Sequence, residues 1–452
     1  MLAKRIKSLV SRLINPENTG LRRIAASEHK IERRRVSQNA IKVCEVLQQH
    51  GYQAYVVGGA VRDLLIGLEP KDFDVATNAT PEQIQPLFRR ARIIGRRFRL
   101  VHVVFGREII ETSTFRAPAS EEQLTDDHGR ILRDNVFGTQ QEDAERRDLT
   151  INALYYDPVS QEVLDFHHGV RDLQNRVVRM IGDAARRYRE DPVRMLRAVR
   201  FAIKLDGTID RQTRAPIAEH GHLLDNVPGA RLFDEMLKLL TCGDAMQCLQ
   251  QLRSHGVHRG VLPLVDLILD EPEGQPFVKI ALERTDARVR AGKTVSPSFL
   301  FAALLWPAVK VSWQRLHQAG EHMAPALITA ADQVLNQHAE ALGITRRFVS
   351  DIREIWFMQP RFDRRVPRVI HRLLEQPRFR AGVEFLQLRA ACSEFDSVVA
   401  QWWMDLADAN DSQRAQMLES LDEQTPAEPG SRKRRRPRRR KARAPEADSN
   451  PA

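Results

Sequence analysis

The first part of the chain alternates short β-type runs with short helical segments. Apolar residues recur at helical spacing between Ser37 and Gly51, and Tyr52–Val57 follows as a β-rich run. We expect a second short helix over Val61–Ile66 and another strand over Phe73–Ala76. This alternation predicts a unit that mixes helices with a β-sheet.

The segment after Thr80 has a capping-box signature, which predicts a helix through Arg90. Arg99–Phe105 and Glu108–Phe115 are β-rich runs joined by a very short connection, a pattern typical of a hairpin. Further short apolar runs cover Leu149–Tyr156 and Gln161–Phe166.

From about Asp183 onward, long helical periodicities dominate. They cover Pro192–Lys204, Ala230–Leu240, Pro367–Leu374 and Gly382–Ala391. We therefore expect an α+β protein, with a small mixed β-sheet in a head that is followed by an all-helical neck and body. The longest apolar stretch, Phe299–Val309, is too short to cross a bilayer, which needs about 20 residues. No membrane span is expected.

The positive charge is concentrated at the two ends. The net charge of the whole chain is +11, of which residues 1–36 carry +7 and residues 431–452 carry +8, so the middle is slightly acidic. Like charges repel in the Arg-rich end, which predicts a disordered tail that binds polyanions such as RNA, with a solubility tail as the alternative. The expected division is a basic arm (1–36), a head (37–170), a neck (171–270), a body (271–422) and the tail (423–452).

The four cysteines are scattered along the chain. Cys242 and Cys248 lack the close spacing of zinc ligands or of a redox pair, so we expect incidental or buried thiols. The basic segment Met1–Ile14 is not followed by a small-residue cleavage site, which argues against export. Both observations favour a cytoplasmic protein.

The turn that precedes Val61–Ile66 contains Gly58, Gly59 and Arg62. Glycines let a ligand approach the backbone closely, and the free N–H groups at a helix start attract phosphate. A cation in the first turn opposes the helix dipole, so an anionic ligand would explain Arg62. Such a turn also occurs for geometric reasons alone.

Asp72 and Asp74 are separated by one residue on or beside the expected strand. Residues two apart on a strand share a face and lie about 6.6 Å apart, so both carboxylates can converge on a pair of metal ions. Hard oxygen ligands suit Mg²⁺. An isolated pair of this kind is often a solvated turn, but this one follows the glycine turn closely, and a later strand offers Glu111.

A third group of polar residues begins around Asp148 and continues at Asp191, Arg194 and Arg197. The last three are spaced by three residues around a helix start, so they share roughly one face. This face could offer one acceptor and two guanidinium groups to a base and to phosphates. A surface helix with salt bridges is the alternative.

These residues lie in runs that resemble a known family. The runs are GGAVRDLLIG, KDFDVATNATPEQ, IGRRFRLVHVVFG, LRDNVFG, RRDLTINALYY and RYREDPVRMLRAVRFA. They resemble the bacterial poly(A) polymerase I branch of the class II nucleotidyltransferase family, which also contains the CCA-adding enzymes. The run GRILRDNVFGT and the basic tail favour the poly(A) branch. Leu149 and Ala60 depart from the common pattern, and Ala60 also occurs in CCA-adding enzymes.

The resemblance implies an enzyme that adds AMP from ATP to RNA 3′ ends without a template. Its cofactors would be two Mg²⁺ ions, with Mn²⁺ as a substitute, and its partners RNA, ATP and either the RNA-degradation machinery or an RNA chaperone. Polyadenylation would then promote RNA turnover. The alternatives are a CCA-adding tRNA nucleotidyltransferase and a non-catalytic RNA-binding adaptor.

The resemblance also implies roles for single residues. The triphosphate would be held by Gly58, Gly59 and Arg62, and the metal ions by Asp72 and Asp74. For the third carboxylate we favour Asp148 over Glu111. Arg147 and Asn152 would contact the phosphate or ribose, and Asp191, Arg194 and Arg197 would lie near the base.

Overall fold

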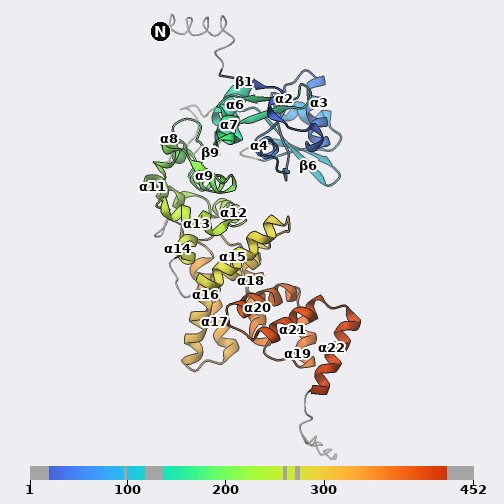
Figure 1. Ribbon diagram of the computed structural model, residues 1–452, viewed down its shortest axis with the longest axis vertical. Coiled ribbons are helices and arrows are strands. Elements are labelled where there is room, and N and C mark those ends of the chain that lie inside the picture. The colour runs from blue at the N-terminus through green and yellow to red at the C-terminus, as the bar shows by residue number, and fades with distance from the viewer. Residues whose placement is uncertain (1–19, 96–98, 118–135, 258–261, 270–274, 425–452) are drawn as a thin grey trace, which may run out of the picture.

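The structure is a computed structural model that describes residues 20–95, 99–117, 136–257, 262–269 and 275–424. Residues 1–19 of the predicted arm and residues 425–452 of the predicted tail lie outside this part. A head that contains the large β-sheet lies at one end of an elongated molecule, and the last helices lie at the other end (Figure 1). The predicted α+β class is confirmed.

The head is built on one mixed sheet of eight strands. The strands are β1 (Arg22–Ile24), β2 (Ala54–Val57), β3 (Asp74–Thr77), β4 (Ala91–Ile94), β5 (Leu100–Phe105), β6 (Glu108–Thr114), β7 (Leu154–Asp157) and β8 (Glu162–Asp165). Their order is β1-β8-β7-β2-β3-β6-β5-β4. All neighbours are antiparallel except β3 and β6, which are parallel. The predicted hairpin of β5 and β6 is confirmed.

Helices cover both faces of this sheet. On one face, α3 (Gln38–Gln49) and α4 (Gly59–Leu65) share an apolar core with the strands. The hydroxyl of Ser37 accepts hydrogen bonds from two backbone N–H groups and caps α3, as its position predicts. On the other face, α6 (Gln140–Arg146) places Ala144 in a smaller aromatic cluster.

The predicted helix through Arg90 is wrong. It ends after one turn as α5 (Pro81–Ile84), continues briefly as the 3₁₀ helix η3 (Gln85–Leu87) and gives way to β4. Pro86 has no N–H group to donate to the preceding turn, so the helix cannot continue regularly. The edge strands β1 and β4 were not predicted. Because β1 pairs with β8, residues 22–24 lie in the sheet of the head, while the domain boundaries given above stay predictions.

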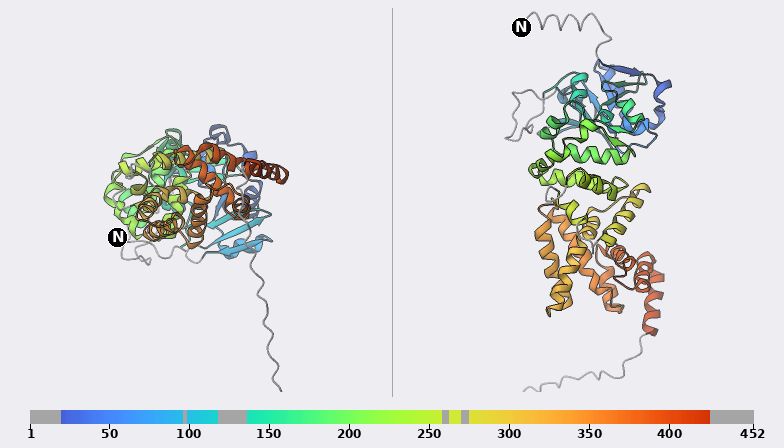
Figure 2. Two further views of the ribbon diagram at one scale, coloured as in Figure 1. Left: turned by 90° about the horizontal axis from the view of Figure 1, so that it is seen from below. Right: turned by 60° about the vertical axis from the view of Figure 1, so that its left-hand side comes forward.

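The rest of the described chain is largely helical. Its elements are α7 (Gly169–Gln174), β9 (Val177–Val178), α8 (Ala184–Glu190), α9 (Val193–Lys204), β10 (Thr208–Ile209), α10 (Arg211–Arg214), α11 (Ile217–His220), α12 (Gly229–Leu240), α13 (Ala245–Ser254), α14 (Pro263–Leu269), α15 (Gln275–Arg290), α16 (Pro297–Gln318), α17 (Met323–His338), α18 (Arg346–Met358), α19 (Pro367–Leu374), α20 (Phe379–Ala391), α21 (Ser397–Asp408) and α22 (Asp411–Gln424). The strands β9 and β10 form a two-stranded parallel sheet. Figure 2 shows the helices leading away from the head.

One apolar core runs through most of these helices. It extends from Leu149 beside the head to Leu388 in α20, and a separate cluster joins α19 to α22. The apolar stretch Phe299–Val309 lies within α16 and is mostly buried in this core. Among the described residues, no helix has the length and apolar character needed to cross a membrane.

Among the largest buried aromatic side chains, the tyrosines lie in the first part of the chain and the tryptophans lie in the later helices. Tyr155 and Tyr156 are fully buried in β7 of the head, and Tyr188 is fully buried in α8. Trp306 and Trp356 are fully buried in the later helices, and so is Trp403.

Candidate active site

A cleft of about 1150 Å³ opens between the head and the helices α9, α12 and the end of α15. Apart from Glu111, every residue that the sequence singled out for catalysis or nucleotide binding lines it. These are Gly58, Gly59, Arg62, Asp72, Asp74, Arg147, Asp148, Asn152, Asp191, Arg194 and Arg197. Residues from three distant parts of the sequence therefore meet at one surface.

The glycine turn connects β2 to α4 at the base of the cleft. Gly58 has a φ of +69°, a conformation that side-chain-bearing residues rarely adopt. A Cβ atom at Gly58 would lie 3.2 Å from Nη1 of Arg147. Glycine is thus required here for two reasons, backbone conformation and the close approach of a guanidinium group.

Arg62 is almost completely buried and is already bound by other side chains. Its guanidinium donates to Asp63 at 2.7 and 2.9 Å and to Oδ1 of Asn152 at 2.6 Å. It also lies over the ring of Phe201, 4.6 Å from its centroid. Asp63 in turn pairs with Lys204 at 3.0 Å. The structure therefore places a network of two cations and one carboxylate beside the glycine turn.

The two acidic residues lie where β3 begins. Asp74 is the first residue of β3, and Asp72 lies in the segment just before it. Phe73 between them packs against the core of the head, as the alternation predicts. Glu111 is the register partner of Asp74 on the parallel strand β6. Loss of hydration, followed by repulsion from Glu111, raises the pKa of Asp74 to about 6.

This acidic pair fits a divalent metal ion that is bound together with a substrate. Among the described residues, neither Asp72 nor Asp74 forms a hydrogen bond or ion pair with another side chain. The same residues contain no group of three or more acidic, histidine or cysteine side chains that would hold a metal ion unaided. Mg²⁺ commonly uses one or two carboxylates and completes its shell with water and substrate phosphates. The carboxylates of Asp72 and Asp74 match this preference of Mg²⁺.

Asp148, in contrast, is tightly held by its neighbours. Its Oδ2 atom accepts hydrogen bonds from Arg197, with a shortest distance of 2.6 Å, and its Oδ1 atom accepts one from Asn152 at 3.2 Å. Burial alone would raise the pKa of Asp148, but Arg197 holds it well below its usual value. Asn152 thus connects Asp148 to Arg62.

Arg147 does not point freely into the cleft. Its guanidinium donates to Asp143 at 3.0 Å and to the hydroxyl of Tyr155 at 3.1 Å. It also donates to the backbone oxygen of Asn152 at 3.4 Å. Arg147 therefore ties α6 to the segment that leads into β7.

The predicted base-contacting residues come from the junction of α8 and α9. Asp191 ends α8, where its Oδ2 atom pairs with Arg231 at 2.6 Å. Its Oδ1 atom is buried and has no hydrogen-bond partner among the described residues. Arg194 donates to Glu190 at 3.1 Å. The cleft thus contains one buried carboxylate oxygen without a donor.

Several lining residues were missed by the sequence analysis. They include Asp63, Lys71, Arg200, Lys204, Arg231, Glu235, Lys238 and Cys242. Glu235 is buried in α12 and lies within 4 Å of the charged groups of Arg197, Arg200 and Lys238. A glutamate among the apolar positions of an amphipathic helix was the signal that could have revealed it.

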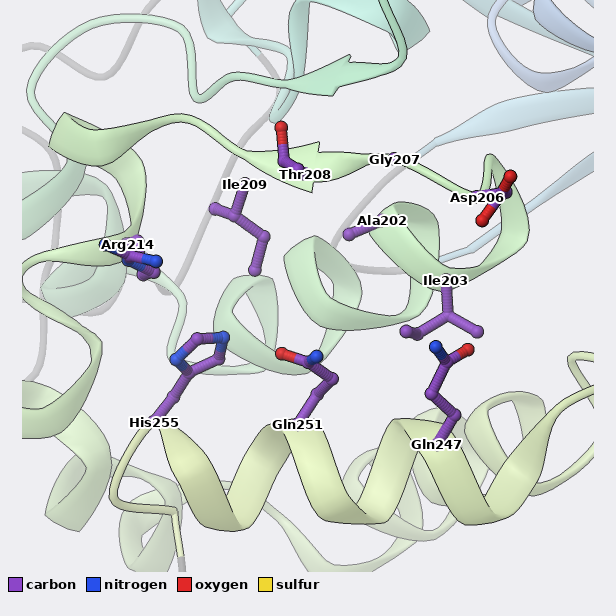
Figure 3. Close-up of a pocket in the computed structure, with 10 residues that line it drawn as sticks. All are labelled: Ala202, Ile203, Asp206, Gly207, Thr208, Ile209, Arg214, Gln247, Gln251 and His255. Atoms are coloured by element: carbon purple, nitrogen blue, oxygen red, sulfur yellow. The ribbon is translucent and has the colours of Figure 1, made fainter.

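A second hollow of about 220 Å³ lies between α9, β10 and α13. Figure 3 shows Gln247 and Gln251 on α13 and His255 directly after it, on the side of the hollow opposite Ile203 and Ile209. None of the predicted site residues lines this hollow.

Three segments of the chain match known protein families. Residues 54–179 match the Poly A polymerase head domain, and residues 207–269 match the probable RNA and SrmB-binding site of polymerase A. Residues 319–441 match the polymerase A arginine-rich C-terminus.

Known poly(A) polymerases are similar in sequence over nearly the whole chain, and CCA-adding enzymes over about half of it. Poly(A) polymerase I of Salmonella typhi is 43% identical over 92% of this chain and 92% of its own. The CCA-adding enzyme of Bacillus licheniformis is 36% identical over 49% of this chain and 54% of its own. Among solved structures, the CCA-adding enzyme of Bacillus stearothermophilus in complex with CTP superposes with a TM-score of 0.53, at 25% identity, and covers 85% of this chain and 81% of its own.

Proposed function

Because this chain belongs to the bacterial poly(A) polymerase I family, we propose that its cleft is the place where ATP and the 3′ end of an RNA meet. The protein is a polynucleotide adenylyltransferase that adds AMP to RNA 3′ ends without a template. The observation that carries the assignment of the site is the unpaired carboxylate pair of Asp72 and Asp74 beside the glycine turn in one cleft.

Asp72 and Asp74 would hold two Mg²⁺ ions together with the triphosphate of ATP. Such ions would neutralise the phosphates and lower the pKa of the RNA 3′-hydroxyl. The chain itself contributes position: Gly58 and Gly59 leave room for phosphate oxygens near the backbone, and the two carboxylates would hold the cations that offset the charge of the phosphates. Ionised Asp74 is needed for this, because a protonated carboxyl group binds a cation poorly.

The contacts shift our proposal for the third carboxylate from Asp148 to Glu111. Glu111 lies beside Asp74 on the neighbouring strand and is close enough to raise its pKa. Its side chain contacts His102 at 3.3 Å, and it is not among the residues that line the cleft. Asp148 is committed to Arg197 and Asn152. We assign Asp148 the role of a positioning residue that orients Arg197 and, through Asn152, Arg62 toward the nucleotide.

The base would lie against Asp191, Arg194 and Arg197. The buried Oδ1 atom of Asp191 lacks a donor among the described residues, and the exocyclic amino group of adenine could supply one. Arg147 would support the phosphate or ribose from behind, since its guanidinium is held by Asp143 and Tyr155.

The metal assignment is tested by Asp72→Asn and Asp74→Asn. Each change removes an anionic ligand while it keeps the shape of the side chain, so we expect AMP addition to fall by about 10²-fold or more with RNA binding retained. Asp206→Asn is the control, because this side chain is 92% exposed and lies outside the cleft. A variant of Asp74 that still extends primers at the wild-type rate would contradict the assignment.

A CCA-adding activity is the second candidate, because such enzymes share about half of this chain. Cytosine also carries an exocyclic amino group, so Asp191 alone does not separate the two bases. Incubation of a generic RNA primer with each NTP distinguishes them: long A tails support polyadenylation, whereas addition of two C and one A to tRNA supports the alternative. RNA retention without any incorporation would indicate an adaptor.

We further propose that the protein acts in the cytoplasm and that its tails promote RNA turnover, in contact with RNA-degradation enzymes or an RNA chaperone. The basic ends support an interaction with RNA, because clustered Lys and Arg neutralise phosphates. Affinity capture of the full-length protein, with and without ribonuclease treatment, separates direct partners from partners that are bridged by RNA.

A further inference from the structure

Two cysteines meet at the wall of the cleft. Cys242 follows the last turn of α12 and lines the cleft between Thr241 and Gly243. Cys248 lies in α13 and is completely buried. Although they are six positions apart in the chain, their Sγ atoms are only 3.1 Å apart. The turn between the two helices creates a contact that the sequence spacing did not indicate.

The surroundings of the two thiols differ. Cys242 is partly exposed, and its contact with the Cys248 thiol, helped by the backbone N–H of Asp244, lowers its pKa although burial opposes this. The pKa of Cys248 is raised by the same contact and by burial. Arg200 adds positive charge near both sulfur atoms. Because Cys242 lines the cleft and ionises more readily than the buried Cys248, Cys242 is the better placed to attack an oxidant and Cys248 to resolve the product.

We propose that Cys242 and Cys248 form a redox-active dithiol site in the wall of the cleft, which a hydroperoxide oxidises to a disulfide. A metal site is a poorer fit, because the described residues offer no third acidic, histidine or cysteine ligand nearby. Access also supports the proposal, since a small hydroperoxide can reach Cys242 through the cleft whereas Cys248 is shielded.

The chemistry balances in two steps. The Cys242 thiolate attacks one oxygen of hydrogen peroxide, the O–O bond breaks, and the leaving hydroxide takes a proton to become water. Cys242 is then a sulfenic acid. The sulfur of Cys248 attacks it, the S–S bond forms, and the proton of Cys248 leaves with the hydroxyl group as a second water. Two electrons pass from the sulfur atoms to the peroxide.

Disulfide formation also changes the cleft. The sulfur atoms must approach from 3.1 Å to about 2.05 Å, and because Cys242 lies on the turn between α12 and α13, we expect this turn to shift. This turn carries Thr241 and Gly243, which line the cleft, and the oxygen of Gly243 accepts a hydrogen bond from Arg290. We therefore expect the oxidised protein to add AMP more slowly, and a thiol reductant to restore the rate.

The direct test is mass spectrometry of the full-length reduced protein before and after treatment with hydrogen peroxide. Trypsin should release residues 239–253 as one peptide that contains both cysteines. After peroxide treatment we expect this peptide to lose the mass of two hydrogen atoms and to resist alkylation until it is reduced. Cys392 is the internal control, because it is partly exposed and is not paired with another thiol in the described part of the chain. Alkylation of Cys242 that stays as complete as that of Cys392 would overturn the proposal.

Two variants separate the roles of the thiols. In Cys248→Ser, Cys242 should accumulate as a sulfenic acid that dimedone traps, and peroxide should form no disulfide. In Cys242→Ser, Cys248 should stay reduced. The mass measurement does not depend on polymerase activity. A failure of the disulfide proposal therefore leaves the proposed function untouched, and the reverse also holds. A disulfide that forms without any change in the rate of AMP addition would refute the effect on the cleft.

Discussion

Gly58 combines a backbone requirement with a steric one, and the chain offers a control that separates them. Gly58 and Gly67 both have a positive φ, but a Cβ atom would approach Arg147 only at Gly58 and would meet nothing within 4 Å at Gly67. We expect Gly58→Ala and Gly67→Ala each to lower the free energy of unfolding by about 1 to 2 kcal/mol, because alanine is strained in this region. Only Gly58→Ala should also lower kcat/KM for ATP, by about tenfold. Equal activity of the two variants would contradict a role for this close approach.

Asp286 provides a pH-dependent effect on stability outside the cleft. Burial, followed by repulsion from Asp244, raises its pKa to about 6, although it accepts hydrogen bonds from the backbone N–H of Ala245. Asp286 then holds more protons in the native protein than in the unfolded chain between pH values of about 4 and 6, so its contribution to the free energy of unfolding falls as pH rises through this window. Asp286→Asn keeps an acceptor for Ala245 and removes the charge. Urea unfolding at several pH values should show that, from about pH 4 to 6, the free energy of unfolding falls less in the variant than in the wild type. The same pH dependence in both proteins would contradict the prediction.

Helices and strands with one apolar face were predictable from the sequence. The early end of a helix and the strands at the edges of the sheet were not. The periodicity after Ser37 and the hairpin of β5 and β6 were read correctly because each buries one face against the core. The helix after Thr80 failed because one internal proline outweighed a good start signal. The edge strand β1 has only three residues and a largely exposed pattern, so its pairing with β8 comes from the sheet and not from local sequence.

The helix α12 contributes to the site through a buried charge. Glu235 lies within 4 Å of the cationic groups of Arg197, Arg200 and Lys238. Glu235→Ala leaves the buried guanidinium group of Arg200 without its anion, whereas Arg197 keeps Asp148, so we expect unfolding to become easier by about 3 kcal/mol and AMP addition to fall. Asp234→Ala is the matched control, since Asp234 is the neighbouring residue on the exposed side of the same helix. Equal stability of the two variants would show that this network contributes little.

The complete site exists only in the folded molecule. Asp148 and Arg197 are 49 positions apart and meet because α9 packs beside the head. The sequence supplied the residue types and the resemblance implied roles that stay predictions, but neither indicated that Arg62, Asn152, Asp148 and Arg197 form one connected network. Such connections depend on tertiary packing, which local periodicity does not encode.

The elongated shape predicts that the length of the primer matters. The described chain ends in α22, at the end of the molecule that is far from the head (Figure 1). We expect removal of residues 431–452 to flatten the salt dependence of binding for long RNA, because each phosphate contact contributes about −0.7 to the slope of log K against log salt for a single strand. A short primer that fills only the cleft should bind equally well with or without these residues. An identical loss for both primers would contradict this arrangement.

The unequal distribution of aromatic residues gives the molecule two separate optical signals. All five tyrosines lie between Tyr52 and Tyr188, and all five tryptophans lie between Trp306 and Trp403. Tryptophan fluorescence therefore reports on the later helices alone, and the near-ultraviolet absorption of tyrosine, once resolved from the overlapping tryptophan absorption, reports mainly on the head. ATP should delay the loss of the tyrosine signal on heating more than that of the tryptophan signal, so melting at these two bands can locate a ligand without any added label.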